Sequence, residues 1–235
     1  MDTKNLLFIG TSHIAKESLK EIKDSFVSFK PDIVAVELDR KRIHALFSKE
    51  EQKISLADIK HIGLKGFLFA YFGRFAQKKL GGMVGVSPGS EMKLAITLAR
   101  EHKLQVALID QDIDITLKKF SKALSWKEKF RFLGDLFRSV FRKKAAMKEL
   151  GIESLDLSKV PSDRLVKNLI AQLKRRYPNI HKVLVHERNI VMSNNLISLM
   201  KKFPDKRIMI VIGAGHEDAI VSMVKRRARS IDVAP

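Results

Sequence analysis

The sequence contains no cysteine, which excludes disulfide bonds and thiolate metal ligands. Any metal ion in this protein must therefore be bound by imidazole nitrogens and by oxygen atoms. Long apolar runs are also missing: a stretch such as 67–72 falls far below the roughly 20 residues that a membrane-spanning helix needs. The first residues, Met1 to Lys4, lack the basic and apolar regions of a signal peptide, so we expect a cytoplasmic location.

Acidic residues are too few to balance the basic ones. There are 45 Lys and Arg against 26 Asp and Glu, which gives a formal net charge of +19. Between Lys118 and Glu149, eleven basic residues stand against three acidic ones, with aromatic and apolar residues interleaved. This pattern predicts amphipathic basic helices and leaves two interpretations open: a solvated helix face, or contact of 118–149 with an anionic membrane surface or partner. RNP, KH, zinc-finger and clear helix-turn-helix motifs are absent, so we expect no specific binding of nucleic acid.

Four short apolar runs are typical of β-strands, and helical periodicity follows them along the chain. The predicted strands are 6–9, 33–36, 106–109 and 207–212, and a last short strand at 230–233 stays open. Because the runs are nearly continuously apolar, they favour a parallel sheet that is covered on both faces. We therefore predict a single α/β domain over 1–235, with a mostly parallel central sheet, helices on both faces, and helical insertions at about 50–87 and 116–204.

Polar and helix-breaking residues predict where helices begin and end. Asp39 and Ser90 are expected to be N-caps, because their side-chain oxygens can accept hydrogen bonds from the free N–H groups of a first turn. Within the long helical stretch, breaks are expected near Gly151, Pro161 and Pro178.

Four polar residues stand just after predicted strands: His13, Glu37, Asp110 and His216. Ligands of open parallel sheets bind at the carboxyl ends of the strands, so these positions predict one shared crevice. His13 and His216 each end a Gly-x-x-His sequence, in which glycine permits a sharp turn between strand and helix. Two neutral imidazoles with carboxylates suit Zn, Mn, Fe or Co, and a position left open to water would make the site catalytic.

The carboxylates near this crevice have several interpretations. Glu37 ends a buried strand, where a carboxylate needs a metal or a cation, so it is our first candidate for a ligand or general base. Asp110 and Asp112 can bind metal, cap the next segment, or pair with Lys118 and Lys119. These three alternatives stay open.

Other charged residues have simpler structural explanations. Compensation of the helix dipole alone explains Glu91 in a first helical turn. Arg40 can pair with a carboxylate or bind a substrate oxyanion, whereas Glu187 and Arg188 are typical of a solvated ion pair on a helix. The sequence lacks a Walker A loop, a Gly-x-Ser-x-Gly elbow and a His-Glu-x-x-His motif.

Six short motifs follow one another over nearly the whole chain: Gly10-Thr11-Ser12-His13, Glu37-Leu38-Asp39-Arg40, Pro88-Gly89-Ser90-Glu91-Met92, Asp110-Gln111-Asp112-Ile113, Glu187-Arg188-Asn189 and Gly213-Ala214-Gly215-His216. In this order they resemble the TraB/PrgY family. That family is grouped with the Tiki-like metalloproteases and looks related to the erythromycin-esterase and ChaN-like fold. TraB and PrgY limit peptide pheromone activity, so the resemblance implies peptide hydrolysis or peptide capture.

The resemblance also implies roles for individual residues. The paired Gly-x-x-His motifs fall on His13 and His216, the acidic motifs fall on Glu37, Glu91 and Glu187, and Arg188 comes with the last of these. This chain departs from the family at Gln111, where the typical sequence has arginine, so a cationic contact is lost there.

We therefore expect a divalent metal, Mn, Co or Zn, with water as its fourth ligand, in a site that hydrolyses a peptide or another amide or ester. The expected ligands are His13, His216 and Glu37; Glu91 or Glu187 would move protons, and Arg40 or Arg188 would stabilise the oxyanion. Two alternatives stay open: a non-catalytic protein that sequesters a peptide or another ligand in the same crevice, and a basic membrane-surface adaptor. A second subunit could complete the site, so a homodimer is also open.

Overall fold

A computed structural model describes residues 3–11, 16–48, 89–123, 125, 127, 128, 131 and 163–232. The strands are β1 (Leu6–Thr11), β2 (Ile33–Val36), β3 (Gln105–Leu108) and β4 (Ile208–Gly213). The helices are η1 (Thr3–Asn5), α1 (Lys16–Phe29), α2 (Arg40–Phe47), α4 (Ser90–Glu101), α5 (Ile113–Ala123), α8 (Asp163–Arg176), α9 (Pro178–His181), η2 (Lys182–His186), α10 (Glu187–Lys202) and α11 (Ala214–Asp232). The predicted insertion at 50–87 lies outside the described residues.

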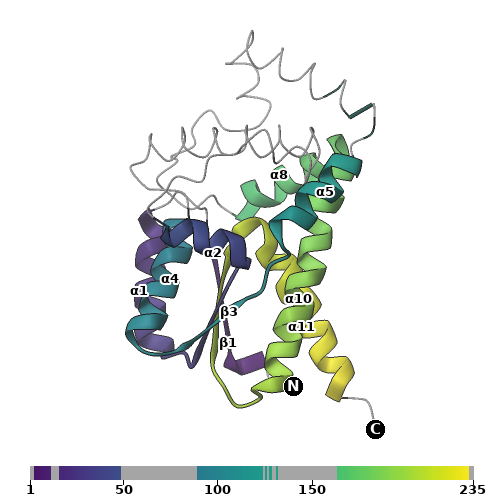
Figure 1. The fold of residues 1–235 in the computed structure, drawn as a ribbon. Helices are drawn as coiled ribbons and strands as arrows, with labels where there is room; N and C mark the ends of the chain where they lie inside the picture. The colour runs from purple at the N-terminus through teal and green to yellow at the C-terminus, as the bar shows by residue number, and fades with distance from the viewer. Residues whose placement is uncertain are drawn as a thin grey trace.

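The four strands form one parallel sheet in the order β1-β4-β2-β3 (Figure 1). The last strand in the sequence, β4, thus lies inside the sheet, and all six of its residues are buried. Its first residue, Ile208, pairs with both Leu6 and Ile33, so β1, β4 and β2 start in register. The four predicted strands and the predicted α/β class are confirmed, with strand boundaries that differ by one or two residues.

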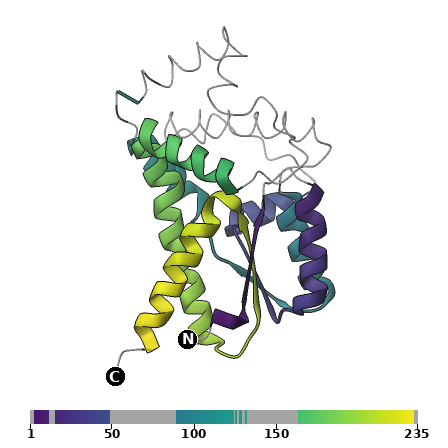
Figure 2. The same cartoon turned by 180° about the vertical axis from the view of Figure 1, so that it is seen from behind.

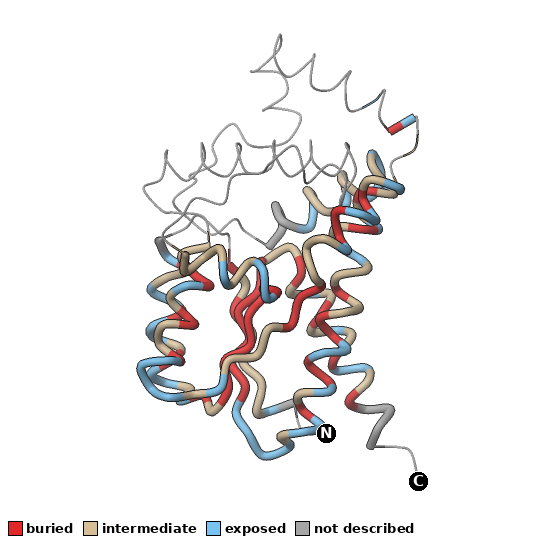
Figure 3. Tube along the Cα trace, viewed as in Figure 1, coloured by how far each residue is buried: buried red, intermediate tan, exposed pale blue. Residues whose placement is uncertain are grey.

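Helices cover both faces of the sheet (Figures 1 and 2). On one face, α1 and α4 pack against alternate side chains of the strands, such as Ile9, Val34 and Val211. On the other face, α10 and α11 pack against the intervening side chains, such as Ala35 and Ile210. The two central strands, β2 and β4, are therefore buried along their whole length, whereas β1 and β3 at the edges of the sheet are partly exposed (Figure 3). Burial on both faces explains the continuous apolar runs in the sequence.

The starts of two helices test the predicted caps. Asp39 is the N-cap of α2, as predicted: its Oδ1 accepts hydrogen bonds from the N–H groups of Lys41 and Arg42, at 2.8 Å and 3.1 Å. The prediction for Ser90 is wrong, because α4 begins one residue earlier than expected and Gly89 is its N-cap. Gly89 has a φ of 82°, a left-handed conformation that glycine adopts without a steric penalty.

The ends of α8 and α11 test two further predictions. A break occurs at Pro178 as expected: α8 ends at Arg176, and the proline lies in the first turn of α9, where its missing N–H costs no hydrogen bond. The last short strand, which the sequence left open at 230–233, does not form at 230–232, because α11 continues through Asp232. No glycine or proline interrupts α11 after its first turn, and Ala228 is still buried, so packing continues along the helix.

The helix that leads into α10 contains a π-helical segment. α9, η2 and α10 follow one another without a gap from Pro178 to Lys202, and the five residues of η2 adopt the wider π conformation. At its end, the N–H of Glu187 donates to the carbonyl of Lys182, five residues earlier. A π segment changes the rotation of the helix that follows it, and such segments often occur at functional sites. Here it directly precedes Arg188.

Candidate functional site

Three charged side chains and a histidine, from four separate segments, meet at the carboxyl ends of the strands. Glu37 follows β2, Asp110 follows β3, His216 lies in the first turn of α11 after β4, and Arg188 projects from the first turn of α10. The predicted convergence of Glu37, Asp110 and His216 is thus present in the structure. His13 lies outside the described residues.

Glu37 is held at the centre of this cluster and is only 5% exposed. Its Oε2 accepts a hydrogen bond from the backbone N–H of Gly213 at 2.6 Å, which ties the end of β2 to the end of β4. Its Oε1 pairs with the guanidinium of Arg188 and lies 3.5 Å from Nε2 of His216. A buried strand therefore ends in a carboxylate with cationic and backbone donors around it, as its burial requires.

Asp110 is the second acidic centre, and its side chain is completely buried. Oδ1 accepts from the N–H of Gln111 at 2.7 Å and from Nε of Arg188 at 3.1 Å. Oδ2 accepts from Nη2 of Arg188 at 2.6 Å and from Nη2 of Arg42 at 2.5 Å. The predicted pairing of Asp110 with Lys118 or Lys119 is wrong, because its cationic partners are Arg42 and Arg188.

Arg188 connects the two carboxylates and the histidine. Its Nη2 bridges Glu37 and Asp110, and its Nη1 lies 3.1 Å from the carbonyl oxygen of Leu184 and 3.2 Å from Nε2 of His216. Burial alone would lower the pKa of this guanidinium, but Glu37 and Asp110 outweigh that effect and raise the pKa, so Arg188 stays charged. The interpretation of Arg188 as a solvated ion-pair residue is wrong, since its side chain is only 14% exposed.

His216 is fixed in one tautomer by its two neighbours. Arginine can only donate hydrogen bonds, so Nε2 of His216 must accept from Nη1 of Arg188. The proton then resides on Nδ1, which lies 2.5 Å from Oδ1 of the buried Asn189. The imidazole is therefore neutral and turns its Nε2 lone pair toward Arg188 and Glu37.

Sequence analysis missed two residues of this cluster, Arg42 and Asn189. Arg42 donates through Nε to Oδ2 of Asp39 at 2.5 Å and through Nη2 to Asp110. The guanidinium of Arg42 is partly buried, which would lower its pKa, but Asp110 and Asp39 outweigh this effect and raise the pKa. The sequence did contain a signal for Arg42, which lies three residues after the cap residue Asp39. A side chain at that position can reach back over the first turn of the helix. Arg40, the predicted candidate, is exposed at the start of α2.

The other predicted acidic residues lie around the same edge of the sheet. Glu91 is completely buried in the first turn of α4, on the face opposite to α10, and the hydroxyl of Ser90 lies 3.5 Å from its Oε2. Glu187 is partly exposed and pairs with Nζ of Lys119 at 2.7 Å. Asp112 accepts a hydrogen bond from the N–H of Asp114 at 2.8 Å, so for Asp112 the capping alternative is correct.

Gln111 occupies a position where the typical family sequence has arginine, and a cation is nevertheless nearby. Its Nε2 donates to Oγ1 of Thr116 at 2.8 Å, and Nζ of Lys119 lies 3.4 Å from its Oε1. Lys119, which lies one turn after Thr116 in α5, therefore supplies a positive charge beside Gln111 as well as beside Glu187.

The end of β1 contacts the start of α11 through Gly10. A Cβ atom at Gly10 would lie 2.0 Å from Oε2 of Glu217, so the Glu217 carboxylate occupies the space beside this glycine. The close approach explains why the first Gly-x-x-His sequence begins with glycine. It also brings Glu217, another residue that sequence analysis missed, next to the end of β1.

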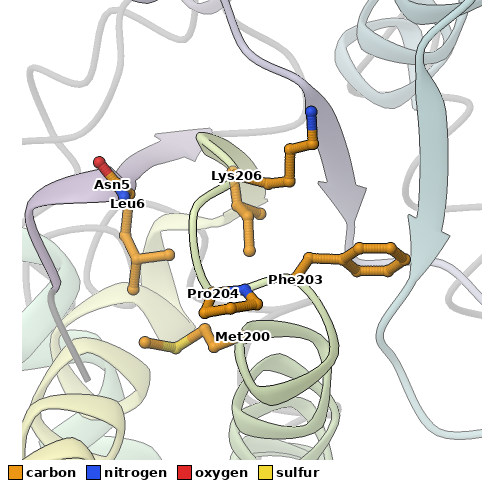
Figure 4. Close-up of a pocket in the computed structure, with 7 residues that line it drawn as sticks. Asn5, Leu6, Met200, Phe203, Pro204 and Lys206 are labelled. Atoms are coloured by element: carbon orange, nitrogen blue, oxygen red, sulfur yellow. The ribbon is translucent and has the colours of Figure 1, made fainter.

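A separate small hollow lies far from this cluster. It is lined by apolar side chains such as Leu6, Met200 and Phe203, at the amino ends of β1 and β4 (Figure 4). Because the charged cluster lies at the carboxyl ends of the same strands, the hollow is at the opposite edge of the sheet and does not belong to the candidate site.

A family model described as the TraB/PrgY/gumN family matches residues 2–229. The chain belongs to the TraB/PrgY/gumN family. An uncharacterized protein of Methanocaldococcus jannaschii is 35% identical over 234 residues, covering 97% of this chain and 55% of that protein. The TraB domain-containing proteins of Homo sapiens and Bos taurus are 22% and 23% identical over 243 residues, covering 93% of this chain and 62% of each relative. The chain thus spans little more than half the length of these curated relatives.

The TraB family resemblance implied a divalent metal, and two of its predicted ligands lie side by side. Nε2 of His216 and Oε1 of Glu37 are 3.5 Å apart, close to the roughly 3.4 Å expected between two ligand atoms of a tetrahedral ion with bonds of about 2.1 Å. The contact from Nδ1 to Asn189 is also typical of metal-binding histidines. The pair therefore fits a divalent ion. Within the described residues no group of three or more His, Asp or Glu is arranged to hold a metal, and His13, the third predicted ligand, lies outside them.

Little of the predicted partner surface is described. Most of 118–149 lies outside the described residues, and contact of this segment with an anionic membrane surface stays a prediction, as do the homodimer and the cytoplasmic location. Among the helices that the structure describes, none combines the length and the apolar composition needed to cross a membrane.

Proposed function

We propose that this TraB family chain is a metal-dependent hydrolase that cleaves a peptide or another amide or ester bond. The observation that carries the proposal is the pairing of His216 with Glu37, 3.5 Å apart at the carboxyl ends of a parallel sheet. A neutral imidazole whose Nδ1 is held by Asn189 supports it, because only the unprotonated Nε2 can bind a metal. His13 is the proposed third ligand.

A divalent ion bound there supplies a Lewis acid for the substrate carbonyl and a bound water of lowered pKa. The protein's own contribution is to fix its ligands before the substrate arrives. The hydrogen bond from Gly213 orients the carboxylate of Glu37, and Asn189 orients the ring of His216. Such preorganisation reduces the reorganisation that the reaction would otherwise require.

Of the two candidate oxyanion donors, the geometry favours Arg188 over Arg40. Nη1 of Arg188 lies 3.2 Å from Nε2 of His216, so its N–H groups face the proposed reaction centre. A planar guanidinium with several donors is suited to bind a developing oxyanion. The side chain of Arg40 is instead exposed at the start of α2.

Of the two candidate proton-transfer groups, Glu187 is favoured over Glu91. Glu187 precedes Arg188 in the chain, its side chain is 24% exposed, and its carboxylate pairs with Lys119, so it can exchange protons with water at the edge of the cluster. Glu91 is completely buried on the opposite face of the sheet.

The experiment combines metal analysis with a peptide-cleavage screen on the full chain. His216→Ala removes a proposed ligand, whereas His186→Ala removes an exposed histidine of η2 and serves as the matched control. We expect one equivalent of Mn, Co or Zn and metal-dependent cleavage in the wild type and in His186→Ala, and loss of both in His216→Ala. A wild type that retains no divalent ion after incubation, and that cleaves no peptide, would contradict the proposal.

A non-catalytic sequestering role is the second candidate, and one observation favours it. Both oxygens of Glu37 and both oxygens of Asp110 already accept hydrogen bonds, chiefly from Arg188. A carboxylate that already accepts hydrogen bonds is a weaker proton acceptor, which disfavours a role as general base in catalysis. Stoichiometric metal with retention of intact peptides would support this second role.

A further inference from the structure

We propose that the guanidinium of Arg188 occupies the cation position of this site in the metal-free protein, and that a divalent metal displaces it from His216 and Glu37. This inference rests on the proposed function, because it assumes that His216 and Glu37 bind metal. It adds a role for Arg188 as a built-in competitor that sets the affinity of the site.

The contacts of Arg188 support the inference. Its Nη1 lies 3.2 Å from Nε2 of His216, and its Nη2 pairs with Oε1 of Glu37. These are the same two atoms whose 3.5 Å separation fits a shared metal ion. Arg188 and a metal ion therefore require the same lone pairs. Nε2 of His216 cannot bind a metal while it accepts a hydrogen bond from Arg188.

A cation is needed at this point in every state of the protein. Glu37 is 5% exposed and the side chain of Asp110 is fully buried, so loss of the Arg188 charge would take the arginine away from Glu37 and leave Asp110 with Arg42 alone. Without metal, Arg188 supplies that charge. With metal bound, a guanidinium left in place would repel the ion at short range, so the two cations exclude each other.

The remaining contacts of Arg188 allow a short displacement. Asp110 accepts from Nε at 3.1 Å and from Nη2 at 2.6 Å, and the carbonyl of Leu184, in the π segment, accepts from Nη1 at 3.1 Å. These contacts are independent of His216 and Glu37. Arg188 can therefore give up the two metal-ligand atoms and still remain paired with Asp110.

The test compares metal affinity in the full chain and three variants. Arg188→Met removes the competing cation, and Arg188→Lys keeps the charge but cannot make all the contacts of a guanidinium. Arg42→Met is the matched control, because Arg42 is also a partly buried arginine bonded to Asp110 but pairs with Asp39 rather than with Glu37. The Kd for Zn²⁺ is measured by competition with a chromophoric chelator, and Co²⁺ binding is followed by visible absorption.

We expect the Kd of Arg188→Met to fall by about tenfold or more and that of Arg188→Lys to fall by less, whereas Arg42→Met should stay within about threefold of the wild type. Zn²⁺ should also raise the Tm of Arg188→Met more than that of the wild type, because the ion replaces a missing charge. If Arg188→Met does not fold, Arg188→Lys decides, and a Kd no lower than that of the wild type overturns the inference.

Two negative results have different meanings. Equal Kd values for the wild type and both Arg188 variants would show that Arg188 does not compete, while the proposed metal site would stand. Absence of metal binding in the wild type and in every folded variant would instead remove the metal site, and the proposed function would fail together with this inference.

Discussion

Nδ1 of His216 lies 2.5 Å from Oδ1 of Asn189, and both side chains are buried although they come from different helices, α11 and α10. This contact joins the two helices that cover one face of the sheet and determines which nitrogen of the imidazole carries the proton. The chemistry proposed for His216 therefore depends on a residue that itself has no charge.

Replacement of Asn189 should weaken metal binding without removing a ligand. We expect Asn189→Ala to raise the Kd for Zn²⁺ by about 10- to 100-fold, the range typical for loss of an outer-shell partner of a metal ligand. Asn194→Ala, an exposed asparagine of the same helix, is the control and should leave the Kd unchanged. The ¹⁵N shifts of the His216 ring should show a proton on Nδ1 in the metal-free wild type, and a proton on Nε2 would contradict the assignment.

The sequence was sufficient to predict the sheet and the place where the acidic residues meet. The strands are short apolar runs, and Glu37 and Asp110 follow them directly, so the parallel sheet itself brings them together. The predicted cap at Asp39 rests on an interaction between near neighbours in the chain, which local sequence determines.

The arginines of the cluster could not be chosen in the same way. Whether Arg40 or Arg42 reaches the carboxylates depends on the residue at which α2 begins, and the burial of Arg188 depends on how α10 rotates after its π segment. Both are consequences of tertiary packing over long sequence separations. A local pattern of Glu187-Arg188-Asn189 on a helix contains no information about which face is buried.

Loss of Arg188 should destabilise the metal-free protein more than loss of Arg42. Arg188→Met removes the side-chain cation from Glu37 and leaves Asp110 with one arginine, which should cost about 3–5 kcal/mol of unfolding free energy. Arg42→Met should cost less, since Asp110 keeps its two bonds to Arg188. The exposed Arg40→Met is the control and should stay within about 0.5 kcal/mol of the wild type. Urea unfolding of EDTA-treated protein measures all three, and equal losses for Arg188→Met and Arg40→Met would refute the buried network.

The contact between Gly10 and Glu217 predicts a coupled pair of substitutions. Gly10→Ala would place a methyl group 2.0 Å from Oε2 of Glu217, so that flexible side chain must move, at a cost of about 1–3 kcal/mol. In a Glu217→Ala background the same change should cost much less, and a double-mutant cycle measures the difference. Gly215→Ala is the control, because its Cβ would make only an ordinary 3.4 Å contact with Ile170. Additive effects of Gly10→Ala and Glu217→Ala would contradict the predicted close approach.

Asp32 should make the stability of the sheet depend on acid pH. The backbone N–H of Arg207 donates to its Oδ2 at 2.9 Å, which ties the start of β2 to the start of β4, and this hydrogen bond, aided by Lys206, holds the pKa of Asp32 below its ordinary value of 3.8. A lowered pKa in the folded state means that the stabilisation is fully present above the unfolded pKa and disappears as the pH falls through the folded pKa.

We therefore expect Asp32→Asn to be less stable than the wild type at pH 6, and we expect this difference in unfolding free energy to shrink as the pH falls toward 3. Asp205→Asn is the control, because Asp205 is an exposed aspartate in the loop that contains Lys206 and Arg207. Urea unfolding at several pH values measures the difference, and a difference that stays constant down to pH 3 would show that Asp32 does not contribute through its charge.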